Sequence, residues 1–121
     1  MTALIIDDTQ ILRRVLSEIL VEFCGITAPN IFEASDGEEG LKEYKRLKPN
    51  VVFLDIAMPK LDGIETIQKM LDVDPGANII MCTAASQKHL VQQCIRAGAK
   101  DYLLKPLAPE RVAVAVKRVS K

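Results

Sequence analysis

The chain has 121 residues, of which 49% are hydrophobic and 26% are charged, as is typical of one soluble globular domain. Sixteen Lys and Arg residues balance sixteen Asp and Glu residues, so no net positive charge attracts the chain to nucleic acid or to an anionic membrane. No apolar run approaches the roughly 20 residues of a membrane-spanning helix. We therefore expect a cytoplasmic protein without direct nucleic-acid contact and without membrane insertion.

The first half of the chain predicts two strand–helix units. An apolar run over residues 4–6 indicates a strand covered on both faces. A helical repeat follows, and we expect its apolar stripe to be buried; the stripe comprises Ile11, Leu12, Val15, Leu16, Ile19, Leu20 and Phe23. A run of mixed polarity over residues 30–34 predicts an edge strand. Asp36 then begins a second helix, which Pro49 ends.

The second half predicts three more units. Strand 51–54 precedes a helix whose start carries Asp62 and Glu65 in the spacing of a capping box. Strand 79–82 precedes a fourth helix, for which Ser86 is the expected N-cap; its inward-facing residues are expected to be Leu90, Val91, Cys94 and Ile95, with Gly98 as the C-cap.

The last unit is a strand over residues 102–104, followed by a fifth helix whose first turn contains Pro109. Regular alternation of strands and helices is typical of an α/β fold with a parallel sheet. Right-handed crossovers would place helices on both faces of that sheet. Periodicity alone does not give the order of the strands.

Polar side chains follow four of the predicted strands directly. Asp7 and Asp8 follow the first strand, Asp55 the third, Thr83 the fourth and Lys105 the fifth. Because ligands bind at the carboxyl ends of strands in open parallel sheets, we expect these five residues to form one site.

The charge of this expected site indicates its chemistry. Two carboxylates about 4 Å apart repel by about 4 kcal/mol at an effective dielectric constant near 20. Hard oxygen ligands beside a phosphate favour Mg²⁺. With a cation bound, Asp55 can attack phosphorus as a nucleophile, while Lys105 and Thr83 can stabilise the phosphoryl oxygens.

These residues, in this order, resemble the receiver domain of bacterial response regulators over residues 1–121, and the free-standing chemotaxis (CheY-like) type is most similar. The resembling segments are Leu4–Asp8, Asp55–Gly63, Cys82–Ala84, Ala97–Tyr102 and Leu104–Pro106. The resemblance implies a flavodoxin-like (βα)5 doubly wound three-layer sandwich, with a parallel five-stranded sheet in the order 2-1-3-4-5.

The resemblance also implies a role for each site residue. Asp55 would accept a phosphoryl group from a histidine kinase, and Lys105 and Thr83 would contact that group. Mg²⁺ would be held by Asp7, Asp8, Asp55 and the backbone carbonyl of Ala57. These are the roles of a regulator that catalyses only its own phosphorylation and dephosphorylation, and is otherwise no enzyme.

In the family, activation moves two switch residues, which here are Thr83 and Tyr102, and the Lys105–Pro106 peptide bond would be cis. The face formed by the fourth helix, fifth strand and fifth helix would then bind a downstream protein, such as a flagellar motor switch component. We expect a monomer or a weak phosphorylation-linked dimer.

Other functions remain to be weighed. An aspartate-nucleophile phosphatase of the haloacid dehalogenase type needs an acid two residues after its nucleophile, and Ala57 stands at that position. A flavodoxin is disfavoured because Asp7 and Asp8 would repel the phosphate of FMN. Within the receiver hypothesis, a phosphorelay carrier and a receiver cut from a DNA-binding regulator remain open beside the chemotaxis switch.

Overall fold

The computed structural model of the protein describes residues 1–56, 58 and 62–120, in which five strands alternate with five helices. The strands are β1 (Ala3–Ile6), β2 (Ile31–Ala34), β3 (Val51–Asp55), β4 (Ile79–Thr83) and β5 (Asp101–Leu104). The helices are α1 (Gln10–Cys24), α2 (Gly37–Leu47), α3 (Gly63–Val73), α4 (Val91–Ala97) and α5 (Pro109–Val119), with short 3-10 helices η1 (Ala28–Asn30) and η2 (Ala85–Leu90). In the described part of the chain, no helix has the length and hydrophobicity needed to cross a membrane.

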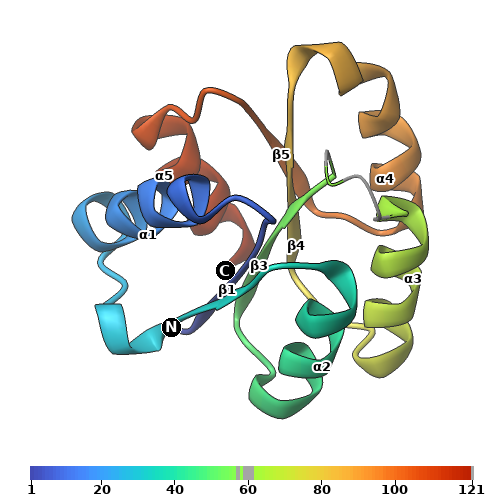
Figure 1. The fold of residues 1–121 in the computed structure, drawn as a ribbon, viewed down its shortest axis with the longest axis horizontal. Coiled ribbons are helices and arrows are strands. Elements are labelled where there is room, and N and C mark those ends of the chain that lie inside the picture. The colour runs from blue at the N-terminus through green and yellow to red at the C-terminus, as the bar shows by residue number, and fades with distance from the viewer. Residues whose placement is uncertain (57, 59–61, 121) are drawn as a thin grey trace.

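The five strands form one parallel sheet in the order β2-β1-β3-β4-β5. Helices α1 and α5 cover one face of the sheet, and α2, α3 and α4 cover the other (Figure 1). This is the flavodoxin-like doubly wound sandwich that was predicted. The mixed strand β2 lies at one edge of the sheet, as its polarity indicated.

Two hydrophobic cores lie on opposite sides of the sheet, and the strands contribute to them alternately. In β1, Leu4 and Ile6 face the core under α2, α3 and α4, whereas Ala3 and Ile5 face the core under α1 and α5. Successive side chains of a strand point to opposite faces. Each strand that is covered on both sides therefore needs a continuous apolar run, which is the pattern that the sequence shows.

The predicted buried stripe of α1 is wider than the stripe that the fold buries. Leu16, Ile19 and Leu20 are buried, but Ile11, Val15 and Phe23 are 73%, 39% and 49% exposed. Ile11 and Val15 lie on the flank of the stripe, turned away from its centre. Phe23 lies in the last turn, just before the chain leaves the helix at Gly25, which has a φ of 68°.

The fourth helix begins later than predicted, because residues 85–90 form η2 and α4 starts at Val91. Ser86 therefore does not cap α4, and no side-chain hydrogen bond caps either η2 or α4. A 3-10 helix has three residues per turn, so it shifts the phase of the residues after it. Ile95, which was expected to face inward, is 40% exposed, whereas Cys94 is buried.

Other predicted helix ends are confirmed. The Asp62 side chain accepts a hydrogen bond from the Glu65 backbone N–H at the start of α3 (3.1 Å), and Pro109 lies in the first turn of α5. Gly98 ends α4 with a φ of 121°. A side chain there would meet Leu71 of α3, so this position requires glycine on both conformational and steric grounds.

Candidate functional site

The carboxyl ends of β1 and β3 bring three acidic residues together. Asp7, Asp8 and Asp55 each offer a carboxylate oxygen, and these three atoms all lie within 4.8 Å of one another. Asp7 and Asp55 are buried, with exposed fractions of 5% and 3%, whereas Asp8 is exposed. The cluster thus combines two buried carboxylates with one that solvent reaches, through which a small ligand could approach.

The parallel register explains why distant residues meet here. Ile6 of β1 is paired with Leu54 of β3, so Asp7, just past the end of β1, lies beside Asp55, the last residue of β3. The Asp7 backbone N–H donates to the carbonyl of Ala34 (3.0 Å). The backbone at Asp7 is therefore held by a main-chain hydrogen bond beyond the end of β1, and Asp55 is still part of β3. Neither carboxylate is carried by a loose loop.

Lys105 supplies positive charge to the cluster from the end of β5. Its Nζ lies 3.1 Å from Oδ1 of Asp55 and 3.7 Å from Oδ2 of Asp7. The Lys105 backbone N–H donates to the carbonyl of Thr83 (2.9 Å), and the Lys105–Pro106 peptide bond is cis. Residues at the ends of three different strands therefore meet at one point, and the ammonium group of Lys105 lies between two of the three acids.

The cluster carries more negative than positive charge among its described residues. The pKa of Asp7 is raised above its ordinary value, chiefly by burial and further by the charge of Asp55, although the Thr9 backbone N–H and Lys105 act in the opposite direction. A raised carboxyl pKa means that the ionised form is poorly compensated. A divalent cation would supply the missing positive charge.

The donor set fits Mg²⁺, which prefers oxygen ligands and keeps several of its waters. Asp7, Asp8 and Asp55 could hold it directly or through water. The fourth predicted ligand, the backbone carbonyl of Ala57, lies outside the described residues. The fit therefore rests on the three carboxylates.

Thr83 is fully buried and lies next to the acidic cluster in the sheet. Cys82 is paired with Asp55 across β3 and β4, and Thr83 is the next residue along β4. Its hydroxyl donates to the carbonyl of Ala84 (3.2 Å). Tyr102, by contrast, is paired with Met81 and lies two residues below the level of Thr83. The structure thus places Tyr102 outside the carboxylate cluster.

Two residues that the sequence interpretation did not single out hold Asp7 in place. The Thr9 backbone N–H donates to Oδ1 of Asp7 (2.8 Å), and Nη1 of Arg13 donates to the Asp7 carbonyl (2.6 Å). Arg13 also pairs with Glu33 of β2 (2.9 Å). Arg13 is not part of the apolar stripe of its helix, and a solvated side chain is the usual expectation for such a position, so only the fold reveals this contact.

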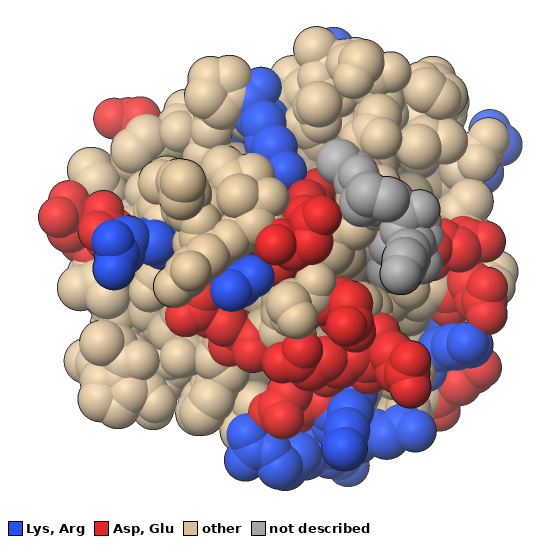
Figure 2. Space-filling view, in the orientation of Figure 1, with Lys and Arg blue, Asp and Glu red and all other residues tan. Residues whose placement is uncertain are grey.

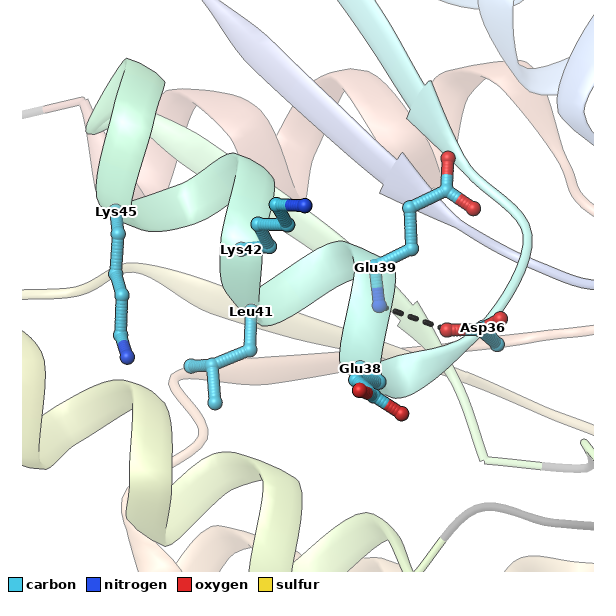
Figure 3. A pocket seen from close by; sticks show the side chains of 6 residues that line it. All are labelled: Asp36, Glu38, Glu39, Leu41, Lys42 and Lys45. Carbon is cyan, nitrogen blue, oxygen red and sulfur yellow. Dashed lines mark hydrogen bonds between the residues drawn. The ribbon is translucent and has the colours of Figure 1, made fainter.

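Acidic side chains gather across the middle of the face of the molecule that Figure 2 shows. A depression of about 500 Å³ lies between the first turns of α2 and α3 and is lined in part by Asp36, Glu38, Asp62 and Glu65. A neighbouring depression of about 460 Å³ lies along α2 and is lined by Asp36, Glu38 and Glu39 at the start of the helix and by Lys42 and Lys45 further along it (Figure 3). Neither depression includes Asp7, Asp55 or Lys105 in its lining, so they are separate from the candidate site.

Comparison with known proteins gives this arrangement a family. Residues 3–117 match the family model of the response regulator receiver domain. The chain therefore belongs to the receiver domain family of response regulators, the regulatory domains of two-component signalling, and is not a conventional enzyme.

Individual relatives support the same conclusion. The chain is 42% identical over 118 residues to a chemotaxis protein CheY of Thermotoga maritima, covering 98% of this chain and 96% of that protein. It is 44% identical to an uncharacterized response regulatory protein of Vibrio cholerae, of which it covers 48%. Among solved structures, Vibrio cholerae chemotaxis protein CheY4 has a TM-score of 0.84 at 26% identity, with 98% of this chain and 97% of that chain covered.

Proposed function

We propose that this protein is a phosphorylation-activated switch of a two-component system, in which Asp55 accepts a phosphoryl group from a histidine kinase. The ion pair between Lys105 and the buried carboxylate of Asp55 (3.1 Å), within a cluster of three acids, is the observation that carries the proposal. Residues 1–121 would act as one receiver domain in the cytoplasm.

The proposed chemistry uses three side chains of the site together with a phosphohistidine as the donor. An oxygen of Asp55 attacks the phosphorus of a phosphohistidine, a new O–P bond forms, and the P–N bond breaks with its electron pair returning to the imidazole. Lys105 would shift its ion pair from Asp55 to a phosphoryl oxygen. The hydroxyl of Thr83, which now donates to the Ala84 carbonyl, would donate to another.

Mg²⁺ fits this proposal because the acidic cluster must admit a group that is itself negatively charged. Asp7, Asp8, Asp55 and the carbonyl of Ala57 would hold the ion. When bound, it would neutralise part of the charge on the phosphoryl oxygens. The Thr9 N–H donates to the Asp7 carboxylate and Arg13 to the Asp7 carbonyl, and these bonds would keep Asp7 oriented toward the ion.

The output would come from the face that α4, β5 and α5 form. Thr83 and Tyr102 would change position on phosphorylation, which couples the site to that face. Ile95 of α4 and Leu104 of β5 are 40% and 37% exposed, so apolar surface is available to a protein partner. The similarity to a chemotaxis protein supports a role in chemotaxis, where the partner would be a protein such as a flagellar motor switch component. The protein would act as a monomer or a weak phosphorylation-linked dimer.

A second candidate function is that of a receiver that passes the phosphoryl group onward in a phosphorelay, or that forms part of a longer response regulator. The Vibrio cholerae response regulatory protein is about twice the length of this chain, so similar receivers do occur beside other segments. A phosphorelay carrier would return its phosphoryl group from Asp55 to another histidine. A receiver of a DNA-binding regulator would instead act on an attached domain.

The acceptor role can be tested with acetyl phosphate and Mg²⁺. We expect the protein to gain the mass of one phosphoryl group, measured on the intact protein, and Asp55→Asn to gain none. Asp36→Asn is the matched control, because Asp36 is an exposed helix cap and asparagine caps a helix equally well. A normal adduct on Asp55→Asn, or loss of the adduct on Asp36→Asn, would contradict the assignment.

A further inference from the structure

A guanidinium group of α5 connects the side chain of Asp101 with Tyr102 on β5. Nη2 of Arg111 donates to Oδ1 of Asp101 (2.7 Å) and to the Tyr102 carbonyl (2.9 Å), and Nη1 lies 3.3 Å from Oδ2 of Asp101. The same guanidinium lies over the Tyr102 ring, 5.9 Å from its centroid. One side chain therefore touches a buried acid, the backbone and the ring of the proposed switch residue.

The buried acid explains why Arg111 is held so firmly. Asp101 is only 7% exposed, and burial alone would raise its pKa. The pKa is nevertheless lowered, because Arg111 and the Tyr102 backbone N–H donate hydrogen bonds to the carboxylate. Paired arginine and carboxylate groups in this two-bond geometry are both strong and directional. Arg111 is thus an anchored group rather than a mobile surface cation.

The anchored guanidinium restricts Tyr102 in two ways. The backbone of Tyr102 is fixed at both polar groups, since its N–H donates to Asp101 (2.8 Å) and its carbonyl accepts from Arg111. Rotation of the side chain is then the freedom that remains. The ring cannot turn away from α5 without losing its cation–π contact with Arg111, which favours the present half-buried position.

We propose that Arg111 is a positioning residue that holds the Tyr102 ring in the inactive arrangement, with Asp101 as its anchor. The inference rests on the proposed function, in which Tyr102 moves on activation. It adds that α5 contributes resistance to this movement, beside the packing of Tyr102 against the core under α2, α3 and α4. Loss of the guanidinium should shift the two-state equilibrium toward the activated arrangement before any phosphorylation.

The sequence offers a direct probe, because it contains two tyrosines and no tryptophan. Incorporation of 3-fluorotyrosine gives one ¹⁹F resonance for Tyr102 and one for Tyr44. Tyr44 is buried and donates from its hydroxyl to Asp74 (2.8 Å), so it reports the integrity of the fold independently. Beryllofluoride with Mg²⁺ serves as the activating probe.

The informative variant is Arg111→Gln, which removes the charge and the cation–π contact but keeps an amide donor. Arg118→Ala is the matched control, because Arg118 also approaches Asp101, at 3.8 Å, from an exposed position. If Arg111→Gln alone disturbs the Tyr44 resonance, the uncompensated charge of buried Asp101 has affected the fold. The measurement is then repeated on the double variant Asp101→Asn with Arg111→Gln, which removes that charge.

We expect the Tyr102 resonance of untreated Arg111→Gln to move toward its position in beryllofluoride-treated wild type. The beryllofluoride concentration at half-change should fall about two- to fivefold, the ratio that an exposed cation–π contact supplies. Tyr44 should not move, and Arg118→Ala should match wild type.

Two other outcomes would overturn the inference in distinguishable ways. If beryllofluoride moves Tyr102 in wild type but Arg111→Gln has the wild-type resonance and midpoint, Arg111 has no positioning role and the proposed switch stands. If beryllofluoride does not move Tyr102 in wild type at all, the switch role of Tyr102 is wrong and the role of Arg111 falls with it.

Discussion

Asp7 and Asp101 are buried to nearly the same extent, yet the fold compensates their charges differently. Asp7, 5% exposed, lies beside two other carboxylates and 3.7 Å from Lys105, and its pKa is raised. Asp101, 7% exposed, accepts hydrogen bonds from Arg111 and from the Tyr102 N–H, and its pKa is lowered despite its burial. Burial raises the pKa of both acids; the partners of Asp101 outweigh that effect, whereas those of Asp7 do not.

The difference separates a cluster of acids whose negative charge is only partly compensated from a contact that is complete within the protein. Around Asp7, excess negative charge remains for a cation to neutralise. Around Asp101, the guanidinium and the backbone N–H satisfy the carboxylate within the protein. The same residue type would thus bind a cation at the end of β1, in the proposed function, and anchor a positioning residue at the start of β5, in the proposed role of Arg111.

The substitution expected to change stability most is Asp101→Asn, which tests whether the partners of Asp101 stabilise the fold. We expect the free energy of unfolding to fall by about 2 kcal/mol, because hydrogen bonds to charged groups contribute about 1.5–3 kcal/mol and the neutral amide weakens those from Arg111. Urea denaturation followed by circular dichroism measures the change. A stability equal to that of wild type would mean that the Asp101–Arg111 pair contributes nothing to the fold.

The pH dependence of the same pair sharpens the comparison. Because the pKa of Asp101 is lower in the folded protein than its ordinary value of 3.8, its contribution to stability is complete above that pH. The contribution is lost as the pH falls through the native pKa. The advantage of wild type over Asp101→Asn should therefore shrink below about pH 4 in urea titrations at several pH values. An advantage that persists unchanged at the lowest pH would contradict the assigned ion pair.

Asp7→Asn should act in the opposite direction when no divalent ion is present. Carboxylates within 4.8 Å repel by about 3 kcal/mol or more at an effective dielectric constant near 20. Attraction to Lys105 offsets part of this repulsion, so we expect a net gain on the order of 1 kcal/mol, or about 4 °C in Tm. The asparagine oxygen can still accept from the Thr9 N–H, which keeps the local geometry.

Mg²⁺ provides the control for that gain. Saturating Mg²⁺ should stabilise wild type more than Asp7→Asn, because the variant loses a carboxylate ligand and binds the ion more weakly. The difference between the Tm of Asp7→Asn and the lower Tm of wild type should thus narrow or change sign as Mg²⁺ is added. If Mg²⁺ raises both Tm values equally, Asp7 does not take part in holding the ion.

The sequence predicted the cluster around Asp7 but not the contact between Asp101 and Arg111. Apolar runs located the strands, and parallel strands must end at one edge, so Asp7, Asp55, Thr83 and Lys105 could be placed together before any coordinates. The resemblance gave the strand order, which periodicity could not. The predicted buried stripe of α1 was too wide and the predicted start of α4 was too early. The width of a helix contact and the phase shift of a 3-10 turn depend on the packed neighbours, which the sequence pattern does not give.

The Asp101–Arg111 contact left a weaker signal. Asp101 directly precedes a strand that was expected to be apolar, and a buried acid there requires a partner. Any of several cations in the C-terminal segment could have supplied it, and only the packing of α5 against β5 selects Arg111. Long-range polar pairs of this kind have no fixed spacing in the sequence, whereas helix caps such as Asp62 with Glu65 do.

The smallest expected effect belongs to Arg118→Ala, and it tests whether distance and exposure distinguish the two arginines near Asp101. Arg118 lies 3.8 Å from the carboxylate and its side chain is 67% exposed, whereas Arg111 lies at 2.7 Å with 36% exposed. Exposed ion pairs contribute between zero and about 1 kcal/mol, so we expect a loss of less than about 0.5 kcal/mol in urea denaturation. High salt should remove even this difference, because water and counterions screen an exposed pair. A loss as large as that of Asp101→Asn would mean that Arg118, and not Arg111, is the main partner of the buried acid.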